Sequence, residues 1–481
     1  MKGMRPVGLV FLLAVVVYGL NFLFAEGFNG GADSFTHYQI SRYSWNYPDL
    51  LLDQWGKPIF TILFSPLAQL GFQAVILGNM ALIFIGAWLA FLIAKKLELK
   101  RPHWIPFMVL FTPIVAGNAI SGLTEMICAL FLIGFILLAL NQKFIWGSIL
   151  LSFMPFARSE GFVIIAVVIL FYVLTKRMKY MPYLLVGSVV FNFIGWAITG
   201  KPLWIFQSNP YMGSSYDDSY GSGPIYHFVM YGVPVFGIGF LLWLWQTLRE
   251  FPAVFNLFKS HQWSLQKQVW IFLILGTSWA YFLAHTVLWW QGIMASLGLV
   301  RVMFVIAVPV ALLALKSWEN LRWSEMRWTN AAFLVLIAVA PFTMRLFPLQ
   351  EIQILPALGV EEQVNVKALA ILEQQPQLSQ AKVYIGHPYM NIILERDPYN
   401  RSVSESMTSF NEKGELVYNY KSAKTGDLVI WDGHYGPNEL HLPADSLEVN
   451  SNFQFIQAVK ADFPFITLGG KEYEIRIYKR I

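Results

Sequence analysis

The stretch FQAVILGNMALIFIGAWLAFLIA, residues 72–94, decides the fold. It contains no charged side chain, and it ends against Lys95 and Lys96. A helix rises about 1.5 Å per residue, so about 20 apolar residues are enough to cross the hydrocarbon core of a bilayer. The stretch therefore predicts a helix that spans a membrane and stops at two basic residues.

Similar apolar runs recur before residue 350 and not after it. Of the 481 residues, 56% are hydrophobic and 13% are charged, whereas a soluble domain carries about 25% charged residues. The net charge of +5 requires no nucleic-acid partner, and the lone Cys128 provides no disulfide framework. We predict an α-helical polytopic membrane protein with about eleven transmembrane helices, near residues 6–24, 72–94, 103–120, 122–141, 144–157, 161–175, 180–199, 228–247, 269–290, 297–315 and 329–348.

The basic residues of the predicted loops indicate the orientation. The residues from Phe22 to Ala25 lack a small-x-small cleavage pattern, so we interpret the first span as a retained anchor. A cytoplasmic N-terminus puts most loop Lys and Arg on the cytoplasmic side, as such residues usually are. We expect a bacterial inner membrane with a periplasmic C-terminus, although an endoplasmic-reticulum membrane gives the same topology. The basic residues concerned are Lys95, Lys96, Lys100, Arg101, Lys143, Lys176, Arg177, Lys179, Arg249, Lys259, Lys267, Lys316, Arg322 and Arg327.

The sequence changes character after the last predicted span. We assign residues 1–349 to a transmembrane domain and residues 350–481 to a small soluble α/β or α+β domain, long enough to bury its own core. A helical pattern covers Val360 to Gln374. Strand patterns follow at Lys382–Ile385, Leu428–Trp431, Phe453–Val459 and Tyr473–Tyr478.

A long polar loop, residues 25–57, joins the first two spans on the outer side. Its glycines allow a sharp turn, and its aromatic spacing predicts helices lying along the membrane interface. Asp33 follows Gly30, Gly31 and Ala32. We interpret it as the N-cap of the first interfacial helix, a position compatible with a catalytic role.

Other charged residues fall on the same predicted side of the membrane. A charge in hydrocarbon costs about 2.5–3.5 kcal/mol on insertion scales, so such residues usually face a polar cavity. Snorkelling, local ion pairs and ordinary core hydrogen bonds are the structural alternatives. Arg301 is the hardest to explain structurally, because its guanidinium stays charged and suits a phosphate. The set comprises Glu125, Arg158, Glu160, His285 and Arg301.

In their order and side of the membrane, these elements resemble the GT-C glycosyltransferases, which take sugars from polyprenyl-phosphate donors. The elements are Gly31-Ala32-Asp33, Trp55-Gly56-Lys57-Pro58, Gly122-Leu123-Thr124-Glu125, Arg158-Ser159-Glu160-Gly161 and Gly298-Leu299-Val300-Arg301. The resemblance covers about the first 315 residues, and it implies a GT-C-like, mannosyltransferase-like hexosyl- or pentosyltransferase. A soluble C-terminal domain on the outer side is also common in that family.

The resemblance implies inverting transfer without a covalent intermediate. Asp33 would act as the general base on the acceptor hydroxyl, and cations would neutralise the leaving phosphate. The implied roles are donor-phosphate binding for Arg301 and Arg158, assisted by His285, Lys57 and Lys201, and orientation or sugar binding for Glu125, Glu160 and Trp55. The implied partners are the lipid donor, membrane lipids and an acceptor that is a glycan, lipid or protein.

Several alternatives remain open from the sequence. We expect no cofactor, but Asp33 and Asp217 could imitate the divalent-metal site of oligosaccharyltransferases. The segment 201–226 is either a lid over the donor or an ordinary loop. His387 and the Asp432-Gly433-His434 element follow strands, so they form either an acceptor site or simple turns. A transporter or lipid flippase without transferase activity is the alternative function, although no internal repeat supports it.

Overall fold

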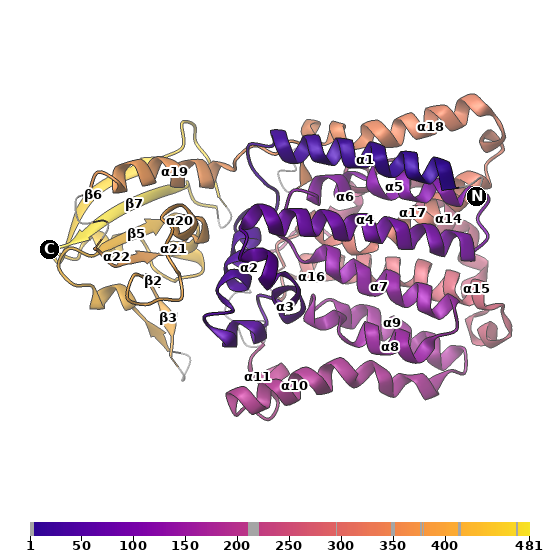
Figure 1. Ribbon diagram of the computed structural model, residues 1–481, viewed down its shortest axis with the longest axis horizontal. Helices are drawn as coiled ribbons and strands as arrows, with labels where there is room; N and C mark the ends of the chain where they lie inside the picture. The colour runs from indigo at the N-terminus through magenta and orange to yellow at the C-terminus, as the bar shows by residue number, and fades with distance from the viewer. Residues whose placement is uncertain are drawn as a thin grey trace.

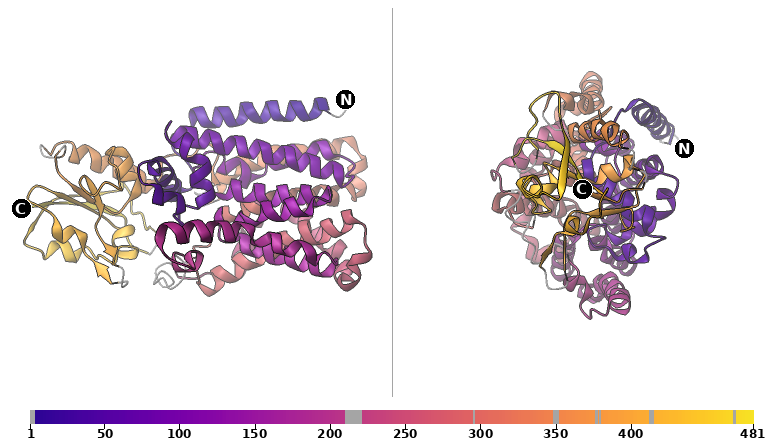
Figure 2. Two further views of the ribbon diagram at one scale, coloured as in Figure 1. Left: turned by 60° about the horizontal axis from the view of Figure 1, so that its bottom comes forward. Right: turned by 90° about the vertical axis from the view of Figure 1, so that its left-hand side faces the viewer.

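The computed structural model describes residues 4–209, 221–294, 296–347, 352–375, 378, 380–411, 415–467 and 470–481. These residues form a bundle of helices and a smaller domain built on a β-sheet, which lies at one end of the bundle (Figure 1). Viewed along the bundle, the sheet domain lies in front of the helix ends (Figure 2). The chain is an integral membrane protein whose apolar helices form the bundle.

Five helical stretches are long and apolar enough to cross a membrane by length and composition, within the part of the chain that the structure describes. They are Arg5–Phe24, Phe72–Lys96, Met178–Thr199, Leu265–Gln291 and Val300–Glu319. Five shorter apolar helices accompany them, at Pro58–Ala68, Glu125–Leu140, Phe144–Phe156, Gly161–Leu174 and Arg327–Thr343. The helical bundle is confirmed, whereas the count of eleven spans stays a prediction.

Proline and glycine interrupt two of the predicted spans. The span expected at residues 103–120 is divided into α5 (Ile105–Leu110) and α6 (Pro113–Asn118). Between them Thr112 is extended, with φ −67° and ψ 131°, because a residue before proline avoids the helical region. The span expected at 228–247 is also broken, since Gly237 has φ +60° and the long helix α14 covers Ile238–Val254.

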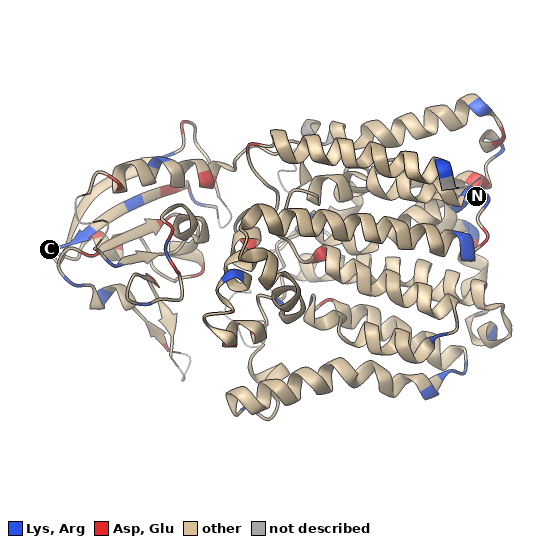
Figure 3. Ribbon diagram, in the orientation of Figure 1, with Lys and Arg blue, Asp and Glu red and all other residues tan. Residues whose placement is uncertain are grey.

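The other long helices that the structure describes also belong to the bundle, and they are named at the end of this paragraph in chain order. A 3₁₀ segment precedes α10 and another precedes α17, and a π-helical segment precedes α16, so these three continue helices that begin earlier. Lys and Arg gather at the end of the bundle that lies away from the sheet domain, where the N-terminus is (Figure 3). The helices are α1 (Met4–Phe24), α4 (Phe72–Lys96), α7 (Glu125–Leu140), α8 (Phe144–Ser152), α9 (Gly161–Leu174), α10 (Val186–Thr199), α16 (Thr277–Gln291), α17 (Ala307–Glu319) and α18 (Arg327–Val339).

The loop at residues 25–57 folds into short helices at the end of the bundle next to the sheet domain (Figure 1). It contains α2 (Gly31–Tyr43) and a 3₁₀ turn at Pro48–Leu52. The element Trp55 to Pro58 leads into the additional helix α3 (Pro58–Ala68), and the predicted second span, α4, follows it. Proline at the first position of α3 suits a helix start, where its missing N–H is not needed.

The soluble domain is a five-stranded mixed sheet in the order β2-β1-β5-β7-β6. Strands β1 (Val383–Ile385), β2 (Ser404–Ser406) and β5 (Leu428–Asp432) are parallel, whereas β6 (Phe453–Lys460) and β7 (Glu474–Arg480) pair antiparallel. Helix α19 (Val360–Leu372) contacts β6 and β7. Each predicted strand is present within two residues of its expected ends, whereas β2 was not expected, because its residues Ser-Glu-Ser carry no apolar pattern.

Direct contacts hold the sheet domain to α2. Gln39 Nε2 donates to the carbonyl oxygen of Pro388 at 3.1 Å, and the rings of Phe35 and Tyr389 stack with centroids 4.7 Å apart. Asn29 Nδ2, just before α2, donates to Gln353 O at 2.8 Å. The short helix α2 is therefore held between the bundle and the sheet domain.

Candidate active site

Helix α2 carries Asp33 near its first turn. The helix begins after Gly30, whose φ of +89° favours glycine, and Ser34 Oγ donates to Asn29 O at 2.9 Å. The N-cap interpretation of Asp33 is wrong, because Gly30 occupies that position and Asp33 lies inside the helix. Its side chain is 37% exposed, so one side of the carboxylate is open.

Arg301 contacts the start of α2 from the far end of the sequence. One guanidinium nitrogen, Nη2, forms an ion pair with Asp33 Oδ2, and the other, Nη1, donates to Gly30 O at 3.0 Å. Arg301 lies in the helical turn Val300–Ile306, which leads into α17. The sequence prediction that these two residues belong to one site is consistent with this contact.

Glu125 connects Arg301 to a second arginine. Its carboxylate is fully buried and lies 2.8 Å from Arg158 Nη1 and 3.7 Å from Arg301 Nε. Glu125 is the first residue of α7, where the positive end of the helix dipole stabilises a carboxylate. Asn79 of α4 fixes the segment before this helix by donating to Ser121 O and Leu123 O at 2.8 and 3.1 Å. The buried acid is thus held by the fold before any substrate binds.

The second arginine extends the network toward α16. Arg158 Nη2 lies 2.7 Å from Glu160 Oε1, and Arg158 Nη1 also donates to Thr124 Oγ1 at 3.2 Å. His285 Nε2 lies 4.0 Å from the same Glu160 oxygen. We call the contiguous set Asp33, Arg301, Glu125, Arg158, Glu160 and His285 the ion-pair network; the sequence had placed all six on one side of the membrane.

Lys57 and Trp55 border this network, together with a histidine that the sequence reasoning did not select. Lys57 is buried and donates through Nζ to Gln54 O at 3.3 Å. The Trp55 ring stacks on the His37 ring with centroids 4.8 Å apart. His37 is 5% exposed, and its Nδ1 has no hydrogen-bond partner among the described residues. The signal that could have found His37 is its spacing of four from Asp33, which puts both on one helix face.

Electrostatics keep the α2 carboxylate ionised and its imidazole neutral. Burial raises the pKa of Asp33, but the positive charge of Arg301 opposes this and the result is a pKa below the ordinary value. Burial, with the charge of Lys57, lowers the pKa of His37 to about 3 although Asp33 opposes that change. At neutral pH Asp33 is therefore an anion, and the neighbouring imidazole is neutral. An ionised carboxylate is the state that a general base requires.

One predicted residue, Lys201, does not join the network, and another, Asp217, falls outside the described residues. Lys201 is exposed, and its Nζ reaches Ser208 Oγ at 3.4 Å; within the described part of the chain it forms no ion pair with the network. Its assignment to the donor phosphate stays a prediction. Asp217, the alternative metal ligand, lies outside the described residues, as does the central part of the segment 201–226.

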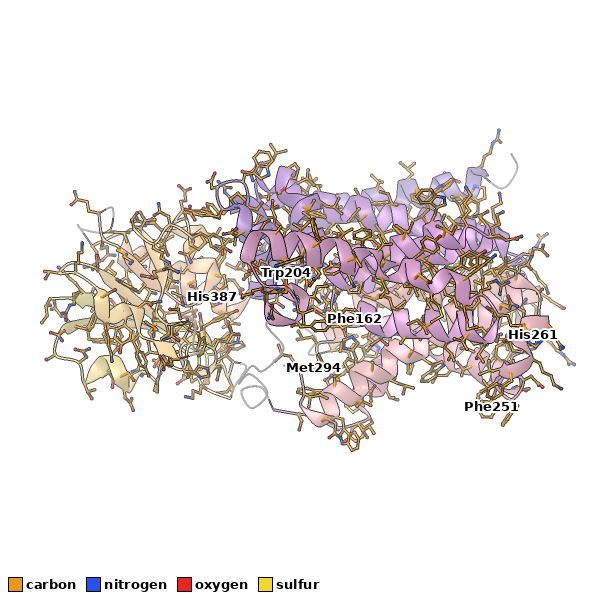
Figure 4. All side chains as sticks on the ribbon, turned by 90° about the horizontal axis from the view of Figure 1, so that it is seen from below. Phe162, Trp204, Phe251, His261, Met294 and His387 are labelled. Carbon is orange, nitrogen blue, oxygen red and sulfur yellow. The ribbon has the colours of Figure 1, made fainter. Side chains whose placement is uncertain are left out.

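The histidines singled out in the soluble domain meet at one carboxylate. His434 Nδ1 lies 2.9 Å and His387 Nε2 lies 3.3 Å from Glu361 Oε2, and Thr467 Oγ1 donates to the other oxygen. Asp432 Oδ1 accepts the backbone N–H of Tyr435 at 2.7 Å, closing the turn after β5. Figure 4 shows His387 on the side of the sheet domain that faces the bundle. This cluster is separate from the ion-pair network.

The described residues offer no group of three or more His, Cys, Asp or Glu side chains arranged to hold a metal ion. Asp33 is paired with a guanidinium, and a positive charge at that oxygen disfavours a second cation there. The described part of the proposed two-residue metal site therefore does not fit a divalent cation well.

Comparison with solved structures finds the same fold in proteins of very different sequence. No family model and no curated protein matches the sequence. ArnT from Cupriavidus metallidurans in the apo state is 11% identical with a TM-score of 0.62, over 100% of this chain and 99% of that chain. The same protein bound to undecaprenyl phosphate is 13% identical with a TM-score of 0.55, over 98% and 97% of the two chains.

The third match is a crystal structure of the Archaeoglobus fulgidus oligosaccharyltransferase with Zn and sulfate. It is 14% identical with a TM-score of 0.50, over 82% of this chain and 62% of that chain. At sequence identities this low, the structural matches establish a common architecture and nothing further. The ArnT alignments span the helical bundle and the sheet domain together, since they cover nearly the whole of both chains. The chain is therefore an integral membrane protein with an ArnT-like fold, a helical bundle followed by a β-sheet domain, as the sequence indicated.

Proposed function

We propose that the protein is an inverting glycosyltransferase that moves a hexose or pentose from a polyprenyl-phosphate donor to an acceptor at the end of the bundle that carries the sheet domain. The observation that carries this proposal is the pairing of Asp33 with Arg301 at the start of α2. It provides one carboxylate that can accept a proton and one guanidinium that can bind a phosphate. The undecaprenyl phosphate bound to ArnT supports the donor class.

The ion pair suggests how donor binding prepares the base. A phosphate oxygen is a strong acceptor for a guanidinium, so the donor phosphate would draw Arg301 away from Asp33. Glu125 holds Arg301 Nε from behind at 3.7 Å and keeps the arginine at the site during this exchange. Asp33 would then be free for the acceptor hydroxyl, and its pKa would rise as the guanidinium moves away.

The transfer step balances charge within the site. The acceptor oxygen forms a bond to the anomeric carbon while the bond from that carbon to the phosphate oxygen breaks, and the electron pair leaves with the polyprenyl phosphate. The acceptor proton moves to Asp33, so one carboxylate charge disappears as one phosphate charge forms. Arg301 and Arg158 stabilise the new negative charge, and direct displacement inverts the anomeric centre. The positive charge of Lys57 is close enough to Glu160 to help lower the pKa of that carboxyl.

We propose that this step needs no divalent metal, because the guanidinium groups supply the positive charge. The proposed setting is a bacterial inner membrane with a cytoplasmic N-terminus and a periplasmic sheet domain. The support for this orientation is the gathering of Lys and Arg at the end of the bundle away from the sheet domain (Figure 3), since basic loops usually stay in the cytoplasm.

The test is the Asp33→Asn variant, assayed for transfer of labelled sugar from polyprenyl-phosphate donors in membranes containing the native acceptors. Loss of a general base should lower the rate by about 10²–10⁴-fold at unchanged protein abundance. Arg301→Lys keeps the charge but cannot contact Gly30 and a phosphate together, so the KM for the donor should rise. Glu98→Gln, an exposed acid at the other end of the bundle, is the matched control. Transfer at the wild-type rate in Asp33→Asn would refute the assignment of the base.

A further inference from the structure

A polar cavity borders Trp55, the residue whose ring stacks on His37 of α2. It is a groove of about 270 Å³ between the loop before α3 and the end of α10. Asp49, Asp53 and Trp55 line one wall, and Thr199 and Ser208 line the other. The volume is near the lower end of the range for small-molecule pockets, about 300 Å³, which suits a ligand of one or two sugar rings. We call this cavity the acidic groove.

Contacts within the protein hold the acidic groove open. Gln54 Nε2 donates to the carbonyl oxygens of Trp204 and Ile205 at 3.2 and 3.1 Å, which ties the two walls together across the chain. Asp53 Oδ1 accepts the Gly56 N–H at 2.7 Å and fixes the turn that presents Trp55. Figure 4 shows Trp204 at the end of the bundle nearest the sheet domain. The groove is a built feature of the fold.

Charge separates the acidic groove from the ion-pair network. Asp49 and Asp53 line the groove, and Asp49 forms no ion pair within the described part of the chain. Lys201, which reaches Ser208 at the rim, is a single cation against two acids. Two carboxylates repel a phosphate but accept hydrogen bonds from sugar hydroxyls. A phosphate group is therefore expected to bind at Arg301 and Arg158, and a ligand with several hydroxyl groups is expected to bind in the groove.

Trp55 connects the acidic groove to Asp33. One face of its ring stacks on buried His37, 4.8 Å between centroids, and Trp55 also lines the groove. His37 follows Asp33 by one helical turn, and side chains with this spacing lie about 5–6 Å apart at Cβ. Two side chains, those of Trp55 and His37, therefore connect the groove to Asp33, the proposed base.

The groove also lies next to a surface that suits lipid. Ile198, which lines the groove, is 56% exposed, and neighbouring Leu203 and Phe206 are each 58% exposed. On a membrane protein, exposed apolar side chains of this kind face acyl chains. A ligand with a sugar head and an alkyl tail could place each part against a matching surface.

We propose that the acidic groove binds a saccharide ring carried by a lipid, with the ring against Trp55 and its hydroxyls on Asp49 and Asp53. Naming this saccharide the acceptor rests on the proposed function, but its binding does not. The lipid-phosphate donor approaches from the opposite side, where Arg301 and Arg158 lie.

The experiment measures binding of octyl glycosides to the purified full-length protein in a maltoside-free amphipol, without any turnover. Octyl glucoside, octyl galactoside and octyl mannoside are the probes, and the matching methyl glycosides separate sugar recognition from alkyl recognition. We expect saturable octyl-glycoside binding that Asp53→Asn, Asp49→Asn and Trp55→Ala each weaken about tenfold, or about 1.4 kcal/mol. Asp53→Asn keeps the oxygen that accepts the Gly56 N–H, so the turn is preserved. Trp55→Phe keeps a ring and should lose less than Trp55→Ala.

Controls distinguish this proposal from the function proposed above. Asp33→Asn should bind octyl glycosides like the wild type even if it transfers no sugar, and Glu98→Gln should be unchanged in both respects. Undecaprenyl phosphate should not compete with the glycosides. The proposal is overturned if no octyl glycoside saturates the wild type, if octanol binds as well as the glycosides, or if the groove variants bind normally. Equal binding of methyl and octyl glycosides would retain the sugar site and refute the lipid-borne ligand.

Discussion

Replacing Glu125 with Gln should destabilise the protein, because this fully buried carboxylate lies between two arginines. With an effective dielectric constant of about 20, its attractions to Arg158 Nη1 at 2.8 Å and Arg301 Nε at 3.7 Å are roughly 6 and 4.5 kcal/mol. Desolvation of the carboxylate offsets much of this sum, so the expected net loss is about 3–5 kcal/mol, as for other broken buried pairs. The two guanidinium groups would then face each other without the anion that separates them.

The measurement is the apparent melting temperature of the purified full-length protein in detergent. Glu160→Gln is the matched comparison, because the Glu160 side chain is 19% exposed and forms an ion pair with one arginine, so its loss should cost less than the loss of Glu125. We expect Glu125→Gln to melt several degrees below wild type and clearly below Glu160→Gln. The reasoning would be wrong if the two variants melted together, or if Glu125→Gln melted like the wild type.

Two further predictions concern metal and pH. Sugar transfer should continue at the same rate in EDTA; loss of transfer in EDTA that Mg²⁺ or Mn²⁺ restores would instead favour the site formed by Asp33 and Asp217. Burial lowers the pKa of His387 and of His434, but hydrogen bonds with Glu361 raise both above the usual value, and the two histidines lower the pKa of Glu361 against the effect of burial. The stability that the histidines contribute is therefore complete below pH about 6.5 and declines as pH rises through their folded-state pKa values. That of Glu361 declines only as pH falls below about 4.5. The difference in melting temperature between wild type and Glu361→Gln should thus be larger at pH 6 than at pH 9; equal differences at both pH values would contradict this account.

The sequence predicted those features that depend on the local spacing of hydrophobic residues and on the free-energy cost of burying a charge. Apolar runs located the helices, and short β patterns located four strands of the soluble domain, because burial of these segments dictates their composition. Five members of the ion-pair network could be named because a charge in or beside an apolar run needs a special environment, and Asp33 was named from its place in the first outer loop. Their distances could not be known, since Asp33 and Arg301 are separated by 268 residues.

Other features depended on contacts that no local pattern records. Asp33 has the residue type and position of an N-cap, yet Gly30 adopts the left-handed conformation and takes that role. The sequence places Lys201 near the outer interface. Lys201 follows the end of α10, so it lies at the acidic groove and not at Arg301. The acidic groove itself joins residues near 50 to residues near 200, so only the folded chain brings Asp53 and Thr199 together.

The anchoring of α2 has a consequence for how the site works. Seven of its thirteen residues are buried, and both the bundle and the sheet domain contact it, through Arg301 on one side and through Pro388 and Tyr389 on the other. A helix fixed on two sides cannot slide to meet a substrate. The position of Asp33 is then preorganised by folding, so under the proposed function the rearrangement on donor binding falls to the guanidinium of Arg301, which a phosphate can recruit.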